Sequence, residues 1–112
     1  GPVMTWELSF LPEAQDDLRS LDGSQRIRVV KAIAKVQENP LPASEGGYGK
    51  PLGNKRVSQL SGLMKVKLKS DGIRIVYKLE RAEHAMRIVV IGVRSDDVVY
   101  REAQKRRESR GL

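Results

Sequence analysis

The sequence predicts a two-layer α+β domain, in which an antiparallel β-sheet carries a pair of helices on one apolar face and is followed by a C-terminal helix. Three observations predict it. Apolar residues alternate with polar ones near the N-terminus and again at 65–78, and they follow a helical spacing between these segments. The nearly continuous apolar run Met86–Val93 is typical of a central strand buried on both faces. The predicted order is therefore β-α-α-loop-β-β-β-α.

The N-terminal third supplies the first strand and both helices of the pair. Thr5–Phe10 alternates apolar and polar residues, as a half-buried strand does. Pro12 suits the first turn of a helix that runs to about Leu21. Ser24 is a good N-cap for a second helix, which runs to about Glu38.

The remaining elements are separated by a long polar segment. Residues 41–62 are rich in Pro, Gly, Ser and Lys and are too long for an ordinary connection, and a short extra strand near Arg56–Leu60 is the one element expected there. After the strand at 86–93, Ser95 or Asp96 can cap a last helix that runs to about Arg107.

A β-hairpin at 65–78 is the strongest local signal. Asp71-Gly72 between alternating residues predicts a two-residue type I′ turn, which would place Lys69 opposite Arg74. Strand side chains alternate with period two, so five cations share one face of this hairpin. They are Lys65, Lys67, Lys69, Arg74 and Lys78. Like charges facing one another destabilise a strand pair, and we therefore expect this face to bind a polyanion.

The next strand brings another cation to the same place. If it returns antiparallel across a short turn, its C-terminal end lies beside the hairpin turn, and Arg94 arrives next to Arg74. Alternation then puts Arg94 on the cationic face. Tyr100, six residues later in the last helix, can overlook the same site.

Composition narrows the class of protein. The 112 residues contain no cysteine, which excludes disulfides, thiolate zinc sites and cysteine nucleophiles and agrees with a cytoplasmic location. No apolar run approaches the roughly 20 residues of a membrane span. We read Gly1-Pro2 and Val3 as the remnant of an expression tag, so residues 1–3 are set aside and residues 4–112 are expected to form one domain.

The charge is high and unevenly distributed. The formal net charge is +7, and residues 1–49 carry five Lys or Arg against seven Asp or Glu, whereas residues 50–112 carry sixteen against seven. A surplus on one segment, with a pI near 10, is the electrostatic signature of nucleic-acid binding. A membrane surface is the weaker alternative, because the cations lie mainly on strands and the chain has only five aromatic residues.

Three motifs carry a resemblance to a known family. They are Lys-x-Lys-Leu-x-Ser-x-Gly-x-Arg-x-Val-Tyr at 65–77, Gly-x-Arg at 92–94 and Val-Tyr-x-x-Ala-x-x-Arg at 99–106. In these the chain resembles the RelE branch of the RelE/ParE toxin superfamily, over almost its whole length. The resemblance implies a microbial-ribonuclease-like fold with the first strand beside the last. It also implies a toxin of a bacterial type II toxin–antitoxin system, which enters the ribosomal A site and cuts the mRNA there.

The resemblance also implies a catalytic set. It comprises two lysines on the first hairpin strand, an arginine on the second, an arginine at the end of the last strand and a tyrosine in the C-terminal helix. In this chain these are Lys65, Lys67, Arg74, Arg94 and Tyr100. Attack of the adjacent ribose 2′-OH on phosphorus builds negative charge that fixed cations stabilise, and it leaves a 2′,3′-cyclic phosphate and a 5′-OH.

The roles within this set follow from simple chemistry. The usual pair of histidines is absent, and crowded like charges favour a neutral lysine, so Lys65 or, by preference, Lys67 is the expected base. Arg74 would hold the scissile phosphate, and Arg94 would stabilise or protonate the leaving oxygen. Tyr100 would stack on or orient a base.

Further cations are expected to bind RNA, and no small-molecule cofactor is expected. The predicted RNA-binding residues are Lys55, Arg56, Lys69, Lys78, Lys105 and Arg106. No His, Asp or Glu set has metal-ligand spacing, and no Gly-rich phosphate loop is present, so we expect neither a metal nor a cofactor. His84, the single histidine, is expected to be a surface residue.

The expected partners are a cognate acidic antitoxin and the ribosome with its mRNA, including 16S rRNA contacts, and no membrane. The antitoxin would either cover the cationic face or displace the C-terminal helix. The alternative function is that of the ParE branch, a non-nuclease inhibitor of DNA gyrase with the same fold. The lysine pair favours the nuclease. The longer Ser44–Gly62 loop and the apolar Ile73 depart from the shortest family members and leave codon preference open.

Overall fold

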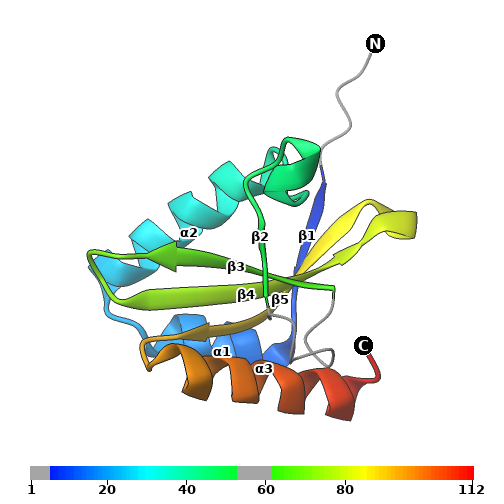
Figure 1. Ribbon diagram of the computed structural model, residues 1–112. Helices are drawn as coiled ribbons and strands as arrows, with labels where there is room; N and C mark the ends of the chain where they lie inside the picture. The colour runs from blue at the N-terminus through cyan, green and yellow to red at the C-terminus, as the bar shows by residue number, and fades with distance from the viewer. Residues whose placement is uncertain (1–5, 53–61) are drawn as a thin grey trace.

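The structure, a computed structural model, describes residues 6–52 and 62–112. In chain order the elements are β1 (Glu7–Phe10), α1 (Pro12–Ser20), α2 (Gly23–Gln37), η1 (Ala43–Glu45), β2 (Lys50–Pro51), β3 (Leu63–Leu68), β4 (Ile73–Glu80), η3 (Arg81–Glu83), β5 (Ala85–Gly92) and α3 (Asp96–Arg110). The two η elements are short 3-10 helices. The predicted α+β class is confirmed (Figure 1).

The five strands form one sheet in the order β1-β5-β4-β3-β2. The strands β2 to β5 pair antiparallel, as predicted, whereas β1 pairs parallel with β5 and makes the sheet mixed. A parallel pair needs a long crossover, which the helical pair and the hairpin between these two strands supply. The expected position of the first strand beside the last is therefore confirmed.

The two faces of the sheet are covered by different helices. Tyr77 of β4 is fully buried on the face covered by the helical pair, and its hydroxyl donates a hydrogen bond of 2.7 Å to the carbonyl of Pro40, just beyond α2. The helix α3 packs against β4 and β5 on the opposite face. There Val99 lies so close to Gly92 that a Cβ on the glycine would come within 2.8 Å of the valine side chain. The cationic face is thus shared between solvent and α3.

The hairpin strands have the predicted faces, but the predicted register between them is wrong. Lys67, not Lys69, lies opposite Arg74, and the turn spans the four residues 69–72. A type I′ turn needs a positive φ at both central residues, but here only Gly72 has one, 66°. The carboxylate of Asp71 instead accepts two hydrogen bonds, of 2.7 and 2.6 Å, from Arg28 of α2. Because the register differs by two residues, each strand side chain keeps its predicted face.

The helix boundaries differ from the predictions by a few residues. Asp22, rather than Ser24, is the N-cap of α2, and it forms a capping box in which its carboxylate accepts from the amide of Gln25 at 2.8 Å. Ser95 caps α3, as predicted, and that helix ends three residues later than expected, before Gly111 in the left-handed region. The extra strand expected near 56–60 lies outside the described residues, and β2 precedes it at 50–51.

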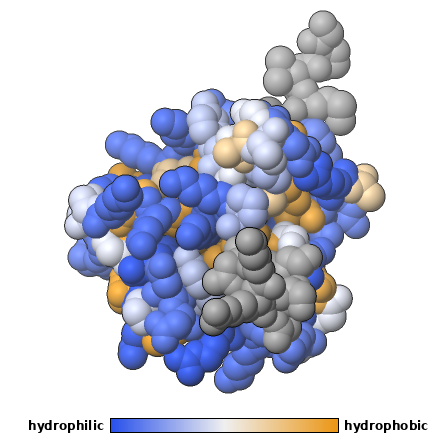
Figure 2. All heavy atoms as spheres, viewed as in Figure 1, coloured by the Kyte–Doolittle hydropathy of each residue, from blue (hydrophilic) through white to orange (hydrophobic). Residues whose placement is uncertain are grey.

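Among the described residues, the charged side chains lie at the surface and not in the core. The face seen in Figure 2 is mainly hydrophilic over the β3–β4 hairpin and along α3. In residues 6–52 and 62–112, none of the helices combines the length and the apolar character needed to cross a membrane.

Candidate functional site

The strands β3 and β4 place Lys67 directly opposite Arg74, with Lys65 two residues away on the same face. The side chain of Lys67 is 39% exposed, and that of Arg74 is 18% exposed. The two cations are therefore neighbours that solvent, or a ligand, can reach.

Arg74 is held in one orientation by three acceptors. Its Nε donates to the carboxylate of Asp96, and its Nη1 donates to the carbonyls of Gly72, at 2.9 Å, and Arg94, at 2.6 Å. Among the described residues, Nη2 makes no hydrogen bond. The Nε and Nη1 donors are thus held by the fold, and the donors of Nη2 can be offered to an anion.

The cationic cluster comprises Lys65, Lys67 and Arg74. Asp96, the first residue of α3, is an acidic residue in contact with it. One of its oxygens serves both Arg74 and Lys67, whose Nζ lies 3.5 Å away. The hydrogen bond from Arg74, with the positive charges of Lys67 and Arg74, lowers the pKa of this carboxyl although partial desolvation opposes the shift. Asp96 is therefore a carboxylate at neutral pH.

Tyr100 of α3 contacts the cationic cluster through Lys65. The Nζ of Lys65 lies 5.8 Å from the centre of its ring, which is within the range of a cation–π contact. Its hydroxyl is buried and finds no hydrogen-bond partner among the described residues. Burial and the charge of Asp96 raise the pKa of this hydroxyl, while Lys67 and Arg74 partly offset them. A buried O–H without a partner is uncommon in folded proteins.

Arg94 follows the end of β5 and reaches the cluster through its backbone. Its carbonyl accepts the hydrogen bond from Arg74, so the two arginines are neighbours, as the strand pairing predicts. Its side chain is exposed and forms no ion pair within the described part of the chain. Four of the expected residues therefore meet through their side chains, namely Lys65, Lys67, Arg74 and Tyr100. The fifth, Arg94, joins them through its carbonyl.

The other predicted RNA-binding residues lie in different surroundings. Lys69 is exposed in the hairpin turn, and Lys105 is exposed on α3. Lys78 shares the cationic face but pairs with Glu80 at 3.3 Å. Lys55 and Arg56 lie outside the described residues.

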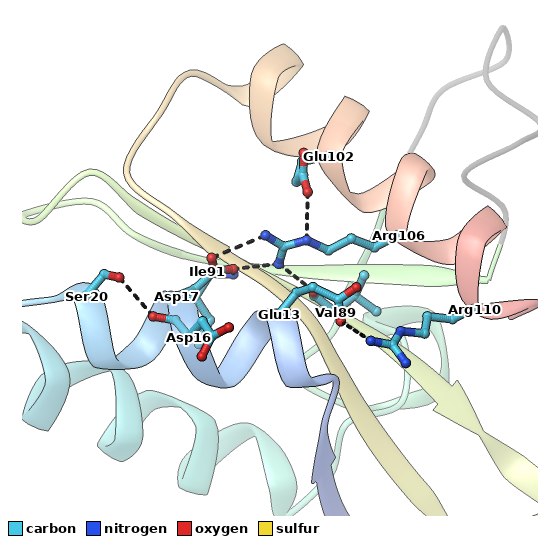
Figure 3. A network of polar contacts seen from close by, with 9 residues as sticks. All are labelled: Glu13, Asp16, Asp17, Ser20, Val89, Ile91, Glu102, Arg106 and Arg110. Atoms are coloured by element: carbon cyan, nitrogen blue, oxygen red, sulfur yellow. Dashed lines mark hydrogen bonds and ion pairs between the residues drawn. The ribbon is translucent and has the colours of Figure 1, made fainter.

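Arg106, another residue predicted to bind RNA, lies in a network of ion pairs and hydrogen bonds within the fold. Its guanidinium is only 12% exposed and donates to Asp17 of α1 at 2.6 and 3.2 Å, to Glu102 at 2.8 Å and to the carbonyl of Val89 at 3.0 Å (Figure 3). Asp17 also accepts from the amide of Ile91 at 3.0 Å. These donors serve the fold, and a role of Arg106 in RNA binding stays a prediction.

The network has a clear structural cause. The ladder between β1 and β5 ends at Ile88, so the edge of β5 beyond it has no neighbouring strand in the part of the chain that the structure describes. Arg106 and Asp17 satisfy the carbonyl of Val89 and the amide of Ile91 on this edge. They also join α3 to α1, which lie side by side in Figure 3. The helix that carries Asp96 and Tyr100 is thereby fixed to the sheet.

Sequence reasoning missed Asp96 as a member of the site and considered it only as a helix cap. Its position two residues after Arg94, at the start of the helix that carries Tyr100, is the signal that could have found it. No group of three or more His, Asp or Glu residues within 6–52 and 62–112 is arranged to hold a metal ion.

Comparison with known proteins shows what the chain as a whole is similar to. No family model matches the chain. Over 103 residues it is 28% identical to the mRNA interferase toxin RelE of Escherichia coli (strain K12), covering 92% of this chain and 98% of the relative. The mRNA interferase RelE of Shigella flexneri matches with the same identity and coverage.

Solved structures show the same resemblance to RelE toxins. A variant of E. coli RelE with two arginines changed to alanine, in the free state, superposes with a TM-score of 0.70 at 25% identity, covering 92% of this chain and 98% of that one. The isolated E. coli RelE toxin gives 0.65 at 27% identity, covering 90% and 97%. The same variant bound to a peptide of the antitoxin RelB gives 0.67 at 25%, covering 89% and 95%. The resemblance to the RelE branch of the RelE/ParE superfamily is therefore confirmed in both sequence and fold.

Proposed function

We propose that this protein is the toxin of a type II toxin–antitoxin system and acts as an mRNA interferase, an endoribonuclease. The names of its relatives support the activity, and the cluster supports the chemistry. The single observation that carries the proposal is the position of Arg74 opposite Lys67, with Nε and Nη1 held by the fold and Nη2 without an acceptor among the described residues.

Cleavage proceeds by attack of the 2′-OH on the neighbouring phosphorus. The base removes the 2′ proton, the 2′-oxygen to phosphorus bond forms, and the bond to the 5′-oxygen breaks. The products are a 2′,3′-cyclic phosphate and a 5′-OH once the leaving oxygen takes up a proton. Negative charge grows on the phosphoryl oxygens, and the Nη2 donors of Arg74 stabilise it.

The lysines supply the base. Lys67 is the preferred candidate, but its ion pair with Asp96 is a reason to test Lys65, whose ammonium lies over the ring of Tyr100, on equal terms. Arg94 stabilises the leaving oxygen through hydrogen bonds, because a guanidinium group holds its proton in proteins. Tyr100 orients the substrate through its ring, beside which Lys65 lies.

The target is mRNA in the ribosomal A site, and the place of action is the cytoplasm. The resemblance carries this part of the proposal. The exposed cations Lys69 and Lys105 extend the site along the hairpin turn and α3, where they can contact mRNA or 16S rRNA.

An acidic antitoxin neutralises the toxin. Relatives have been solved as complexes with the antitoxin RelB, among them the E. coli variant with its RelB peptide. A net charge of +7 favours a partner of opposite sign. The gyrase inhibitor remains the alternative class, and the lysine pair and the relatives both favour the nuclease.

The test is a mapped cut in mRNA held in translating ribosomes. Primer extension with the wild type should give discrete stops that disappear in Arg74→Ala and Arg94→Ala. Lys31→Ala removes an exposed cation from α2 and should leave the stops unchanged. Absence of stops, together with altered DNA supercoiling, would replace the nuclease with the gyrase inhibitor.

A further inference from the structure

A second feature of the cationic face is a hollow on the other side of β3 from Arg74. Its volume is about 220 Å³, and it is lined by Tyr48, Lys50, Lys65, Val66, Lys67 and Lys69. Pockets for drug-sized ligands usually span about 300–1,000 Å³, so this hollow suits a single planar ring system. Neither Tyr48 nor Lys50 belongs to the set that the resemblance implies.

Tyr48 projects from a firmly held backbone. Its amide donates to the carbonyl of Asn39 at 2.9 Å. Both neighbouring residues are glycines in close contact with other segments: a Cβ on Gly49 would lie 2.4 Å from the hydroxyl of Tyr77, and one on Gly47 would lie 2.1 Å from a main-chain oxygen. The ring of Tyr48 is nevertheless half exposed. The Nζ of Lys35 lies over the ring, 5.5 Å from its centre, and the exposed part of the ring needs little ordering before a flat group stacks on it.

All the charged side chains that line the hollow are positive. Lys50 and Lys65 face each other across the β2–β3 pair, an arrangement that destabilises a sheet. Within the described residues, no carboxylate lines the hollow, and Lys50, Lys65 and Lys69 form no ion pair. Unneutralised cations around an exposed aromatic ring are the combination that binds single-stranded nucleic acid, in which bases stack and phosphates are neutralised.

The hollow continues the candidate active site. Lys65 and Lys67 belong to both, with Arg74 on the β4 side of β3 and Lys50 on the β2 side. Neighbouring strands lie about 4.8 Å apart, so a strand of RNA that leaves Arg74 reaches the hollow within about one nucleotide. Tyr48 lies in the segment 44–62, in which the chain is longer than the shortest family members.

We infer that the hollow is a subsite for one nucleotide of single-stranded RNA, in which Tyr48 stacks on the base and the lysines neutralise its phosphates. The inference rests on the proposed function, since it assigns the nucleotide next to the cleaved linkage. It makes Tyr48 a substrate-binding residue that is separate from the chemistry at Arg74.

The test is binding of an oligonucleotide that cannot be cut. A fluorescein-labelled 2′-O-methyl RNA hexamer lacks the nucleophile, and its affinity is measured by fluorescence anisotropy at low salt. Tyr48→Ala should weaken binding by about tenfold, because loss of base stacking has an effect of that order. Tyr48→Phe should bind like the wild type, and so should the control Lys31→Ala. Melting curves establish that the variants are folded.

A series of hexamers, each with one abasic position, supplies the decisive comparison. For the wild type, one position should weaken binding as much as Tyr48→Ala does, and combining the two should cost no more than either alone. The inference is overturned if Tyr48→Ala binds normally, if the losses add at every position, or if the wild type does not bind the hexamer. Equal dependence of a glutamate-rich peptide on Tyr48 would make the hollow a protein interface instead. Cleavage on ribosomes tests the proposed function separately.

Discussion

Asp96 and Arg74 form the ion pair around which the candidate site is built. A carboxylate from the first turn of α3 accepts from the guanidinium of β4, and the same oxygen lies 3.5 Å from the Nζ of Lys67. The pair orients Arg74, but it also neutralises part of the charge that would attract a phosphate. These two effects have opposite consequences for catalysis and for affinity.

Asp96→Asn should separate them. Without the charged acceptor Arg74 is less firmly oriented, and kcat should fall roughly tenfold, equivalent to about 1.4 kcal/mol of transition-state stabilisation. KM should fall as well, because the cationic cluster gains a net positive charge. The control Asp97→Asn changes net charge equally at a residue that pairs with Arg101. Unchanged kcat and KM in Asp96→Asn would remove Asp96 from the positioning of Arg74.

The pH dependence of this pair has a definite sign. The pKa of Asp96 is lowered, so the ion pair is fully formed above the ordinary aspartate range near 4 and is lost as the pH falls through the lowered pKa. An NMR titration of the Asp96 carboxyl carbon should show this. In Arg74→Ala, the pKa should rise toward the ordinary value. Identical titration curves in both proteins would show that Arg74 does not cause the shift.

The alternation of side chains along a strand could predict the site, because it assigns each residue to one face of the sheet. Lys65, Lys67 and Arg74 keep their common face even though the hairpin register was wrong. The register itself depends on Asp71, whose carboxylate is bound by Arg28, 43 residues away in the chain. Such a contact cannot be read from local turn statistics.

The roles of three other residues depend on the packing of distant segments. Arg106 looks like a solvated basic residue until the β1–β5 ladder is seen to end early. The place of Tyr48 follows from the close contacts of its flanking glycines. Asp96 was expected to cap a helix, and only the meeting of α3 with β4 makes it a partner of Arg74.

The buried hydroxyl of Tyr77 should contribute to stability. It donates to the carbonyl of Pro40, and burial raises its pKa, so it remains protonated in mildly alkaline solution. Tyr77→Phe leaves that carbonyl without this donor and should lower the free energy of unfolding by about 1–2 kcal/mol. Urea denaturation measures the change. Tyr48→Phe, which removes a hydroxyl from a half-exposed ring, is the matched control and should be neutral. Equal stability of both variants would contradict the assignment.

The pair of Arg106 and Asp17 should stabilise the fold more than the neighbouring pair of Arg110 and Glu13. Both join α3 to α1, but the first is mostly buried and satisfies the open edge of β5, whereas the second is largely exposed. Arg106→Ala leaves Asp17 and the carbonyl of Val89 without this donor, and we expect a loss of about 2–3 kcal/mol in the free energy of unfolding.

Arg110→Ala removes the same charge from the same helix and should destabilise the fold much less, because exposed ion pairs contribute little. Urea denaturation of both variants and of Asp17→Asn provides the comparison. Asp17→Asn should destabilise nearly as much as Arg106→Ala, and the double variant should lose less than the sum of the two, because both act on one contact. Strict additivity, or equal stability of the two arginine variants, would show that the edge of β5 does not depend on this network. The packing of the buried residues Val99 and Ala103 would then contribute more to holding the helix that presents Asp96 and Tyr100.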